Sequence, residues 1–433
     1  MMIKYIYIFS LLLIANSIAG QQVTKSTYGD VLLKNATVHT VTDGTLNNTD
    51  VFIKDGLIAD IGNNLSAGRN VTTVDCSGKH IYPGFIDSDT RLALSEVSAV
   101  SLTNDFNEIG DLIPHMQALT AVNPNATAIP VTRVNGVTSV IVAPTGGIFP
   151  GTASLIDLIG YTPEQMDAGF RGVIMNFPSS ARRGRRDSRS DEDIKKAQDK
   201  ATKKIDEVWD ELALYHKIDS AATGNSKAHI KYQPEMDALL PVYRGEFPLM
   251  INVSKDKDIE AAINWVTKKG VKAIFIGVSE GYRVADKIAE AGIPVIAGPV
   301  LSVPGRAEAR YDVAYANPGI MAKAGVKVAI RTGDSENVRN LPFNAGFAAT
   351  YGMGKEEALK AITINPAEMF GVADKYGSIS KGKVANLFVS TGDPFEMKTR
   401  LTHLFIKGWN VPIESRHTLL YNEFLKRSPG LED

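Results

Sequence analysis

The sequence predicts an α/β protein that combines a (β/α)8 TIM-like barrel with a small discontinuous β-sandwich domain built from both ends of the chain. Two patterns predict this fold class. Short β-branched runs alternate with amphipathic helical stretches through the middle of the chain, and β-rich segments broken by turn residues flank that middle on both sides. The same alternation also fits a doubly wound parallel sheet, which is the alternative fold.

The two β-rich ends set the expected domain boundaries. We expect the composite β-sandwich domain in residues 28–82 and 371–415, and a C-terminal tail in residues 416–433. The first part holds V-L-L-K-N-A-T-V-H-T-V and a hairpin signal, Asp55-Gly56, between two alternating runs. The second part holds K-V-A-N-L-F-V-S and L-T-H-L-F-I-K-G-W-N-V.

The barrel is expected in residues 83–370, where apolar runs typical of buried parallel strands recur. They read G-V-T-S-V-I-V-A-P, G-V-I-M-N-F-P, F-P-L-M-I-N-V, V-K-A-I-F-I-G-V, I-P-V-I-A-G-P-V and V-K-V-A-I-R-T-G-D. Helical stretches lie between them, such as D-I-E-A-A-I-N-W-V-T-K-K-G with Gly270 as its C-cap. The Gly-rich run from Pro144 to Ala153 is expected to form either a tight turn or a loop over a pocket.

Residues 182–217 form a charged helical insert. Five arginines lead into a helix with an apolar stripe at three- and four-residue steps. The arginines are Arg182, Arg183, Arg185, Arg186 and Arg189. A solvated surface helix explains this pattern, and an anion-binding lip over the barrel mouth is the other interpretation, because arginine matches the geometry of carboxylate and phosphate groups.

Residues 1–19 have the pattern of a secretory signal peptide. Lys4 precedes an apolar run that ends at Ile14, and small residues follow. We therefore expect an exported protein, periplasmic or secreted, with no membrane association after signal removal. An N-terminal membrane anchor is the alternative, although the apolar run is shorter than the roughly 20 residues that span a bilayer.

Composition excludes some classes of protein. A hydrophobic content of 44% over 433 residues can fill a large core, and a formal net charge of −1 gives no sign of a nucleic-acid partner. Cys76 is the single cysteine, so an intramolecular disulfide is impossible.

Three segments carry a resemblance to a known family. They are I-Y-P-G-F-I-D-S-D-T-R-L, a terminal helix with an Asn365-Pro366 signature, and the run G-S-I-S-K-G-K-V-A-N-L. Together they resemble the amidohydrolase superfamily of metal-dependent hydrolases, closest to its imidazolonepropionase-like and dipeptide-hydrolysing branch, in which a His-x-His pair follows Pro-Gly-x-Ile-Asp at the end of the first barrel strand. The resemblance implies the barrel and β-sandwich fold, with the active site at the C-terminal ends of the barrel strands.

The resemblance also implies six metal-ligand positions, and most of them have changed residue type. The usual set is two histidines after strand one, a lysine or glutamate on strand four, histidines on strands five and six, and an aspartate after strand eight. These positions fall on Asp89, Arg91, Ile174, Asn252, Gly277 and Asp334. Only Asp334 keeps its type, and Gly333 is the alternative match there. The sequence therefore predicts a degenerate metal centre.

Two functions follow from this pattern. The first is a non-catalytic, exported protein without a cofactor that binds a small-molecule amide or peptide, and that forms a homo-oligomer or a hetero-oligomer with an active paralogue. The second is a hydrolase of carbon–nitrogen bonds in which Asp87, Asp89 and Asp334 converge.

In that second case the three carboxylates, with Asn252, suit a hard divalent cation such as magnesium or calcium better than zinc, and Asp89 and Asp334 are the possible metal ligands. Alternatively the carboxylates act as general acid and base, with Arg91 stabilising an oxyanion. A structural interpretation of the same residues pairs Arg91 with Asp89 and makes Asp87 a strand-end acid. The residues expected to line the pocket are Asp87, Asn252, Gly277 and Ile174.

Overall fold

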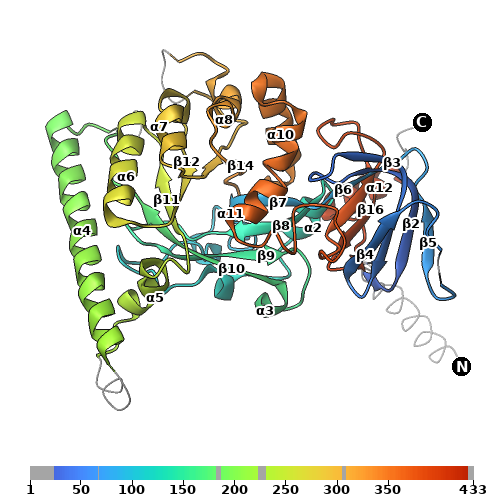
Figure 1. Ribbon diagram of the computed structural model, residues 1–433, viewed down its shortest axis with the longest axis horizontal. Helices are drawn as coiled ribbons and strands as arrows, with labels where there is room; N and C mark the ends of the chain where they lie inside the picture. The colour runs from blue at the N-terminus through green and yellow to red at the C-terminus, as the bar shows by residue number, and fades with distance from the viewer. Residues whose placement is uncertain (1–23, 67, 182–186, 223–230, 305–308, 428–433) are drawn as a thin grey trace, which may run out of the picture.

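The computed structural model describes residues 24–66, 68–181, 187–222, 231–304 and 309–427. An eight-stranded sheet with helices around it forms one part of the molecule, and a nine-stranded sheet forms the other (Figure 1). The expected signal peptide, residues 1–19, lies outside the described residues, as do four arginines of the charged insert in residues 182–186. Within the described ranges, no helix is long and apolar enough to span a membrane.

The eight-stranded sheet is a nearly closed barrel. Its strands run in the order β14-β13-β12-β11-β10-β9-β8-β7. The first and last strands meet beyond their ends, where the amide of Gly333 donates to the Asp89 carbonyl (3.1 Å) and that of Arg91 to the Asp334 carbonyl (3.0 Å). Because the first and last strands meet, the sheet is a barrel, and the alternative of an open, doubly wound sheet is wrong. The strands are β7 (Phe85–Thr90), β8 (Val137–Val142), β9 (Gly151–Asp157), β10 (Asp167–Asn176), β11 (Leu249–Val253), β12 (Ala273–Gly277), β13 (Val295–Ala297) and β14 (Val328–Ile330).

One strand of the barrel runs against the others. Strand β9 pairs antiparallel with both β8 and β10, whereas the remaining pairs are parallel. The expectation of a fully parallel, strictly alternating barrel is therefore wrong at this strand. Its cause is the Gly-rich connection between β8 and β9, which is too short for a crossover helix, since parallel neighbours need a dozen residues or more.

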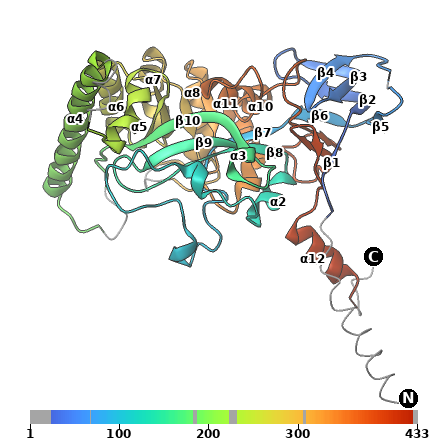
Figure 2. The ribbon, with the colours of Figure 1, turned by 90° about the horizontal axis from the view of Figure 1, so that it is seen from below.

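Helices cover the outside of the barrel (Figure 2). No long helix follows β7; residues 91–127 instead form an irregular segment that bridges to β9 at Gln117 and Thr152. Helix α11 (Ile364–Met369) closes the N-terminal end of the barrel, where Phe370 packs on Phe170 of β10 with ring centroids 4.7 Å apart. The other barrel helices are α2 (Ala128–Arg133), α3 (Pro163–Met166), α5 (Pro234–Tyr243), α6 (Asp256–Lys269), α7 (Ala285–Glu290), α8 (Val313–Lys323), α9 (Leu341–Ala348) and α10 (Lys355–Lys360).

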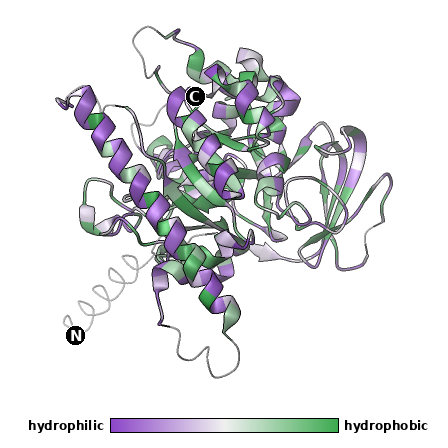
Figure 3. Cartoon of the chain, turned by 60° about the vertical axis from the view of Figure 1, so that its left-hand side comes forward, coloured by the Kyte–Doolittle hydropathy of each residue, from purple (hydrophilic) through white to green (hydrophobic). Residues whose placement is uncertain are grey.

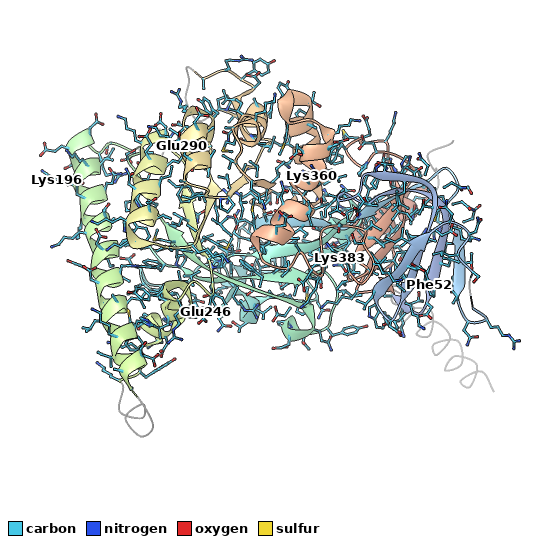
Figure 4. The ribbon with its side chains drawn as sticks, viewed as in Figure 1. Phe52, Lys196, Glu246, Glu290, Lys360 and Lys383 are labelled. Carbon is cyan, nitrogen blue, oxygen red and sulfur yellow. The ribbon has the colours of Figure 1, made fainter. Side chains whose placement is uncertain are left out.

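The charged insert forms the longest described helix, α4 (Asp191–Ala221), at one end of the molecule. A capping box between Ser190 and Asp193 starts it. Hydrophilic residues cover most of its visible face in Figure 3, and Lys196 points away from the barrel in Figure 4. Its opposite face is buried, and Trp209 meets Trp265 of α6 edge-on at 5.2 Å. The helix is thus an amphipathic part of the outer layer.

The barrel interior is a packed apolar core and not a pore, as in barrels generally. Every strand contributes at least one buried residue to it, and the isoleucines dominate. The strand residues are Ile86, Ile141, Ala153, Leu155, Ala168, Phe170, Ile174, Met250, Ile274, Ile276, Ile296 and Ala329. The C-terminal ends of the parallel strands, which we call the barrel mouth, carry polar side chains on the inner side.

Both ends of the chain contribute to the nine-stranded sheet. Strand β6 pairs parallel with β2 and antiparallel with β15, so it joins the N-terminal strands to the C-terminal ones. A separate two-sheet sandwich stays a prediction, and residues 416–433 contain a helix, α12 (Arg416–Leu425). The strands are β1 (Thr27–Tyr28), β2 (Val31–His39), β3 (Thr45–Lys54), β4 (Leu57–Gly62), β5 (Thr72–Asp75), β6 (His80–Pro83), β15 (Leu387–Ser390), β16 (Leu401–Ile406) and β17 (Trp409–Asn410).

Candidate functional site in the barrel mouth

Strand alternation decides which residues reach the inner side of the mouth. Side chains two residues apart in a strand share a face. The residues two positions after the interior residues Ile174, Met250 and Ala329 therefore face inward at the strand ends. They are Asn176, Asn252 and Arg331. Sequence comparison with the family ligand pattern did not single out Asn176 or Arg331. The signal that could have found Arg331 is a charged residue in an otherwise apolar run, two positions beyond an interior alanine.

Arg331 is the central side chain of the mouth. Its Nη1 atom forms an ion pair with Asp89, and its Nε atom donates to the Gly298 carbonyl at 3.0 Å. The two side chains are only 18% and 14% exposed, so water screens their attraction less than on an open surface. Asp89, which stands at the first histidine position, is therefore paired with a cation that the chain itself supplies.

Arg91 is not the partner of Asp89. Its Nη2 atom donates to the Gly333 carbonyl at 2.7 Å, and its guanidinium lies 5.5 Å from the centroid of the Phe106 ring. The structural interpretation that pairs Arg91 with Asp89 is therefore wrong, because Arg331 holds that place. Arg91 instead ties the end of β7 to the end of β14.

Asp334 turns its carboxylate to its own loop. It accepts hydrogen bonds from the backbone amides of Ser335, Glu336 and Asn337, at 2.7 to 3.2 Å. Partial burial alone would raise the pKa of Asp334, but the hydrogen bonds from Glu336, Asn337 and Ser335 outweigh it and hold the pKa below its usual value. The carboxylate is thus an ionised loop cap.

Asp87 lies at the seam between the first and last strands and is fully buried. Its carboxyl group accepts from the backbone amide of Thr332 (3.1 Å) and from the Thr332 hydroxyl (2.6 Å). Burial raises the pKa of Asp87 to about 7, although the hydrogen bonds from Thr332 oppose the rise. Because the neighbouring Ile86 faces the interior, Asp87 faces the opposite side of the sheet. Its hydrogen bonds to Thr332 join strand β7 to the chain just after β14 and so help to close the barrel.

Asn252 and Ile174 lie at different depths. Ile174 is 1% exposed within the apolar interior. Asn252 is at the mouth, level with Asn176 in the pairing of β10 and β11, and its Nδ2 atom donates to the Asn176 Oδ1 atom at 2.9 Å. Asn176 in turn donates to the carbonyls of Gly146 and Gly147, at 2.8 and 2.9 Å. The Gly-rich turn is thereby fixed beside the mouth.

Gly277 borders a pocket at the ends of β12 and β13. Its φ of 90° is in the region that favours glycine. A Cβ atom at Gly277 would lie 3.4 Å from Arg331 Nη2, 3.5 Å from Ser254 Oγ and 3.6 Å from the Val253 carbonyl oxygen. The pocket encloses about 680 Å³ of non-atom space, open solvent included. Its lining is Gly277, Ser279, Glu280, Tyr282, Gly298, Pro299, Ser302, Val303, Pro304, Ala309, Val313, Ala314 and Asn317.

The residues of the mouth do not fit a metal centre of the family type. Within the part of the chain that the structure describes, no three His, Cys, Asp or Glu side chains gather so that they could hold an ion. Asp87 and Asp334 make other hydrogen bonds, and Asp89 faces the Arg331 guanidinium. A divalent ion next to Asp89 would meet a fixed positive charge.

The fold and the mouth define the class of protein, a nearly closed eight-stranded barrel with polar side chains at the C-terminal ends of its parallel strands. The model of the amidohydrolase family matches residues 80–411. The chain therefore belongs to the amidohydrolase family, and the predicted membership of that superfamily is confirmed.

Curated relatives match the chain only in part. The adenine deaminase of Rubrobacter xylanophilus is 22% identical over 403 residues, which cover 86% of this chain and 56% of that protein. The dihydropyrimidinase of Dictyostelium discoideum is 34% identical over 79 residues, 18% of this chain and 15% of that protein. The chain thus spans little more than half of one relative and a small part of the other.

Solved structures match over a larger share. An amidohydrolase from Thermotoga maritima MSB8 is 27% identical with a TM-score of 0.79, and the match covers 88% of this chain and 99% of that one. A Xaa-Pro dipeptidase is 15% identical with a TM-score of 0.52 over the same shares, which shows a common fold.

Proposed function

We propose that this chain is an exported, non-catalytic member of the amidohydrolase superfamily that binds a small-molecule amide or peptide at the barrel mouth without a metal ion. The observation that carries the proposal is the ion pair between Arg331 and Asp89. It supports a mouth whose positive charge comes from a side chain instead of an ion.

Electrostatics favour this function. A carboxylate that is already paired gains less from a metal ion, and a nearby guanidinium repels a divalent cation in a site that water screens poorly. Metal-dependent hydrolysis needs an ion that lowers the pKa of bound water towards about 7. A mouth without such an ion can bind a ligand but cannot hydrolyse it by this metal-dependent route.

The second candidate is a hydrolase of carbon–nitrogen bonds with a carboxylate-based site, with or without a divalent cation, and family membership favours it. It requires Asp87, Asp89 and Asp334 to act at one point. Each carboxylate has a different environment: Asp87 is held by Thr332, Asp89 by Arg331 and Asp334 by its own loop. These separate partners support the binding function over the hydrolytic one.

Export and assembly are further parts of the proposal. The N-terminal pattern of residues 1–19 supports export to the periplasm or the medium. Exposed apolar side chains on the segment after β7 support a homo-oligomer or a complex with an active paralogue, since Leu102 is 92% and Ile109 100% exposed. Light scattering of the purified protein, alone and with such a paralogue, measures the mass of each assembly.

One NMR experiment tests the proposed function. The purified protein is mixed with a panel of dipeptides and small amides, without and with added Zn²⁺ or Mg²⁺, and ligand signals are followed over time. Saturation transfer to a panel member without product signals is the expected result. Product that accumulates with time, and faster with added metal, would establish hydrolysis and contradict the proposal.

A further inference from the structure

Helix α12 keeps its apolar side chains exposed. None of its residues is buried, and Leu420, Tyr421 and Phe424 are 37%, 62% and 53% exposed. Steps of three and four residues place these three side chains on one side of the helix. The helix also lies beyond residue 411, where the family match ends. An exposed apolar helix side of this kind indicates a protein partner.

The segment after β7 has a second exposed apolar surface, and this one is acidic. Leu102 and Ile109 are 92% and 100% exposed. Residues 92–127, which we call the acidic segment, contain four carboxylates and no lysine or arginine. The carboxylates are those of Glu96, Asp105, Glu108 and Asp111. Within the described ranges only Asp111 forms an ion pair, with Lys204 at 2.9 Å, so three exposed acids remain unpaired.

The side of the molecule formed by α2 and α12 carries the opposite charge. The two helices lie next to each other, and Arg133, Arg416 and Lys426 have no carboxylate partner among the residues that the structure describes. The Nε atom of Arg133 is buried without a hydrogen bond, and burial lowers the pKa of its guanidinium to about 10. A buried cation without a counter-charge is costly. A carboxylate from another chain would therefore stabilise Arg133.

Figure 2 places the two surfaces on the same side of the molecule. Helix α12 and the blue-green acidic segment both project from the lower edge of the molecule in that view. A two-fold axis midway between them turns a second copy over, so that α12 of each copy meets the acidic segment of the other. The charges are complementary in both of these contacts, whereas two acidic segments or two copies of α12 that faced each other would repel.

We propose that this chain forms a homodimer in which α12 of each copy packs on the acidic segment of the other. In each of the two equal contacts the apolar side of α12 meets Leu102 and Ile109, and the unpaired cations of α2 and α12 face the unpaired acids. This inference rests on the assembly part of the proposed function, because it names the partner, a second copy, and the surface that binds it.

Analytical ultracentrifugation of the full chain tests the interface, because a concentration series gives the Kd of the dimer. Leu102→Glu and Phe424→Glu should each raise this Kd by about tenfold or more, since both contacts then bury a carboxylate against apolar groups. The control is Leu214→Glu, on an exposed leucine of α4, which should leave the Kd unchanged. A one-to-one mixture of Leu102→Glu and Phe424→Glu should dimerise more tightly than either variant alone, because a mixed pair keeps one intact contact.

The outcomes separate this interface from the proposed function. A monomer at every concentration, or a dimer that both variants leave unchanged, would overturn the interface. A mixture that dimerises no more tightly than either variant would overturn the reciprocal arrangement. A monomer that co-sediments with an active paralogue would assign the surface to that partner and overturn the homodimer. None of these results changes the non-catalytic function, which the NMR experiment tests separately. Equal thermal unfolding midpoints confirm that the variants are folded.

Discussion

At the scale of single residues, the Arg331–Asp89 pair is the feature on which the chemistry of the mouth depends. The substitution Arg331→Met removes the cation that pairs with Asp89, whose side chain is only 14% exposed in the native chain. We expect the free energy of unfolding to fall by about 2 kcal/mol. Urea unfolding measures this change.

A double-mutant cycle supplies the control for this pair. With Asp89→Asn in place, Arg331→Met should cost clearly less than in the native chain, because no unpaired carboxylate remains. Equal costs in both backgrounds would show that the two side chains do not interact, and the view of Arg331 as the partner of Asp89 would fail.

Asp87 makes stability depend on pH. Its pKa is about 7 in the folded protein, against 3.8 for an aspartate side chain that is free in water, so the folded state binds the extra proton between these values. Folding is therefore favoured at low pH, and this contribution is lost as the pH rises from about 4 to 7. Its upper size is on the order of 4 kcal/mol, since each pKa unit corresponds to about 1.4 kcal/mol.

The variant Asp87→Asn isolates this effect. Unfolding free energies at pH 4.5, 5.5, 6.5 and 7.5 should decline less steeply for Asp87→Asn than for the native chain. The difference between the two curves removes the contributions of other acids. A difference that is flat with pH would contradict the raised pKa of Asp87.

At the scale of elements, Gly84 is the single residue between strand β6 of one sheet and strand β7 of the other. A methyl group at this position would overlap the side chain of Thr138 on β8. We expect Gly84→Ala to lower the free energy of unfolding by roughly 1–3 kcal/mol, the usual cost of overpacking. Gly29→Ala, where the added methyl meets nothing within 4 Å, is the control. Equal midpoints of urea unfolding would contradict the close approach.

Helix α4 offers a matched pair of leucines. Leu212 is fully buried and Leu214 is 59% exposed on the same helix. Leu212→Ala should destabilise the chain by about 2–5 kcal/mol and Leu214→Ala by less than about 0.5 kcal/mol, because only the first leaves a cavity. Similar losses for both, measured by urea unfolding, would mean that α4 does not pack as described.

Strand β9 shows where sequence patterns fail at this scale. Its sequence, G-T-A-S-L-I-D, is not among the apolar runs that predict strands, and its first residues, Gly151–Ala153, belong to the Gly-rich run that was expected to be a turn or a loop. The short Gly-rich connection before it was the available signal. Arg331 was missed for another reason: the family pattern directs attention to ligand positions, whereas the residue that compensates Asp89 lies outside that pattern and becomes visible only when β14 meets β7.

At the scale of the whole molecule, the barrel with both chain ends in one adjoining sheet could be predicted from the alternating runs and the two β-rich ends. The loss of usual ligand types was also visible in the sequence. What replaces them was not, because residues 89 and 331 are far apart in the chain and pair only through barrel closure. Long-range partners of this kind leave no local pattern.

The most direct test of a metal-free mouth is the metal content of the full-length protein by mass spectrometry, purified without an affinity tag and dialysed against Zn²⁺, Mn²⁺ or Mg²⁺. We predict far less than one ion per chain, and no difference for Asp89→Asn or Asp334→Ala. One ion per chain that is lost in either variant would show a working metal centre, and the proposal that Arg331 supplies the positive charge of the mouth would be wrong.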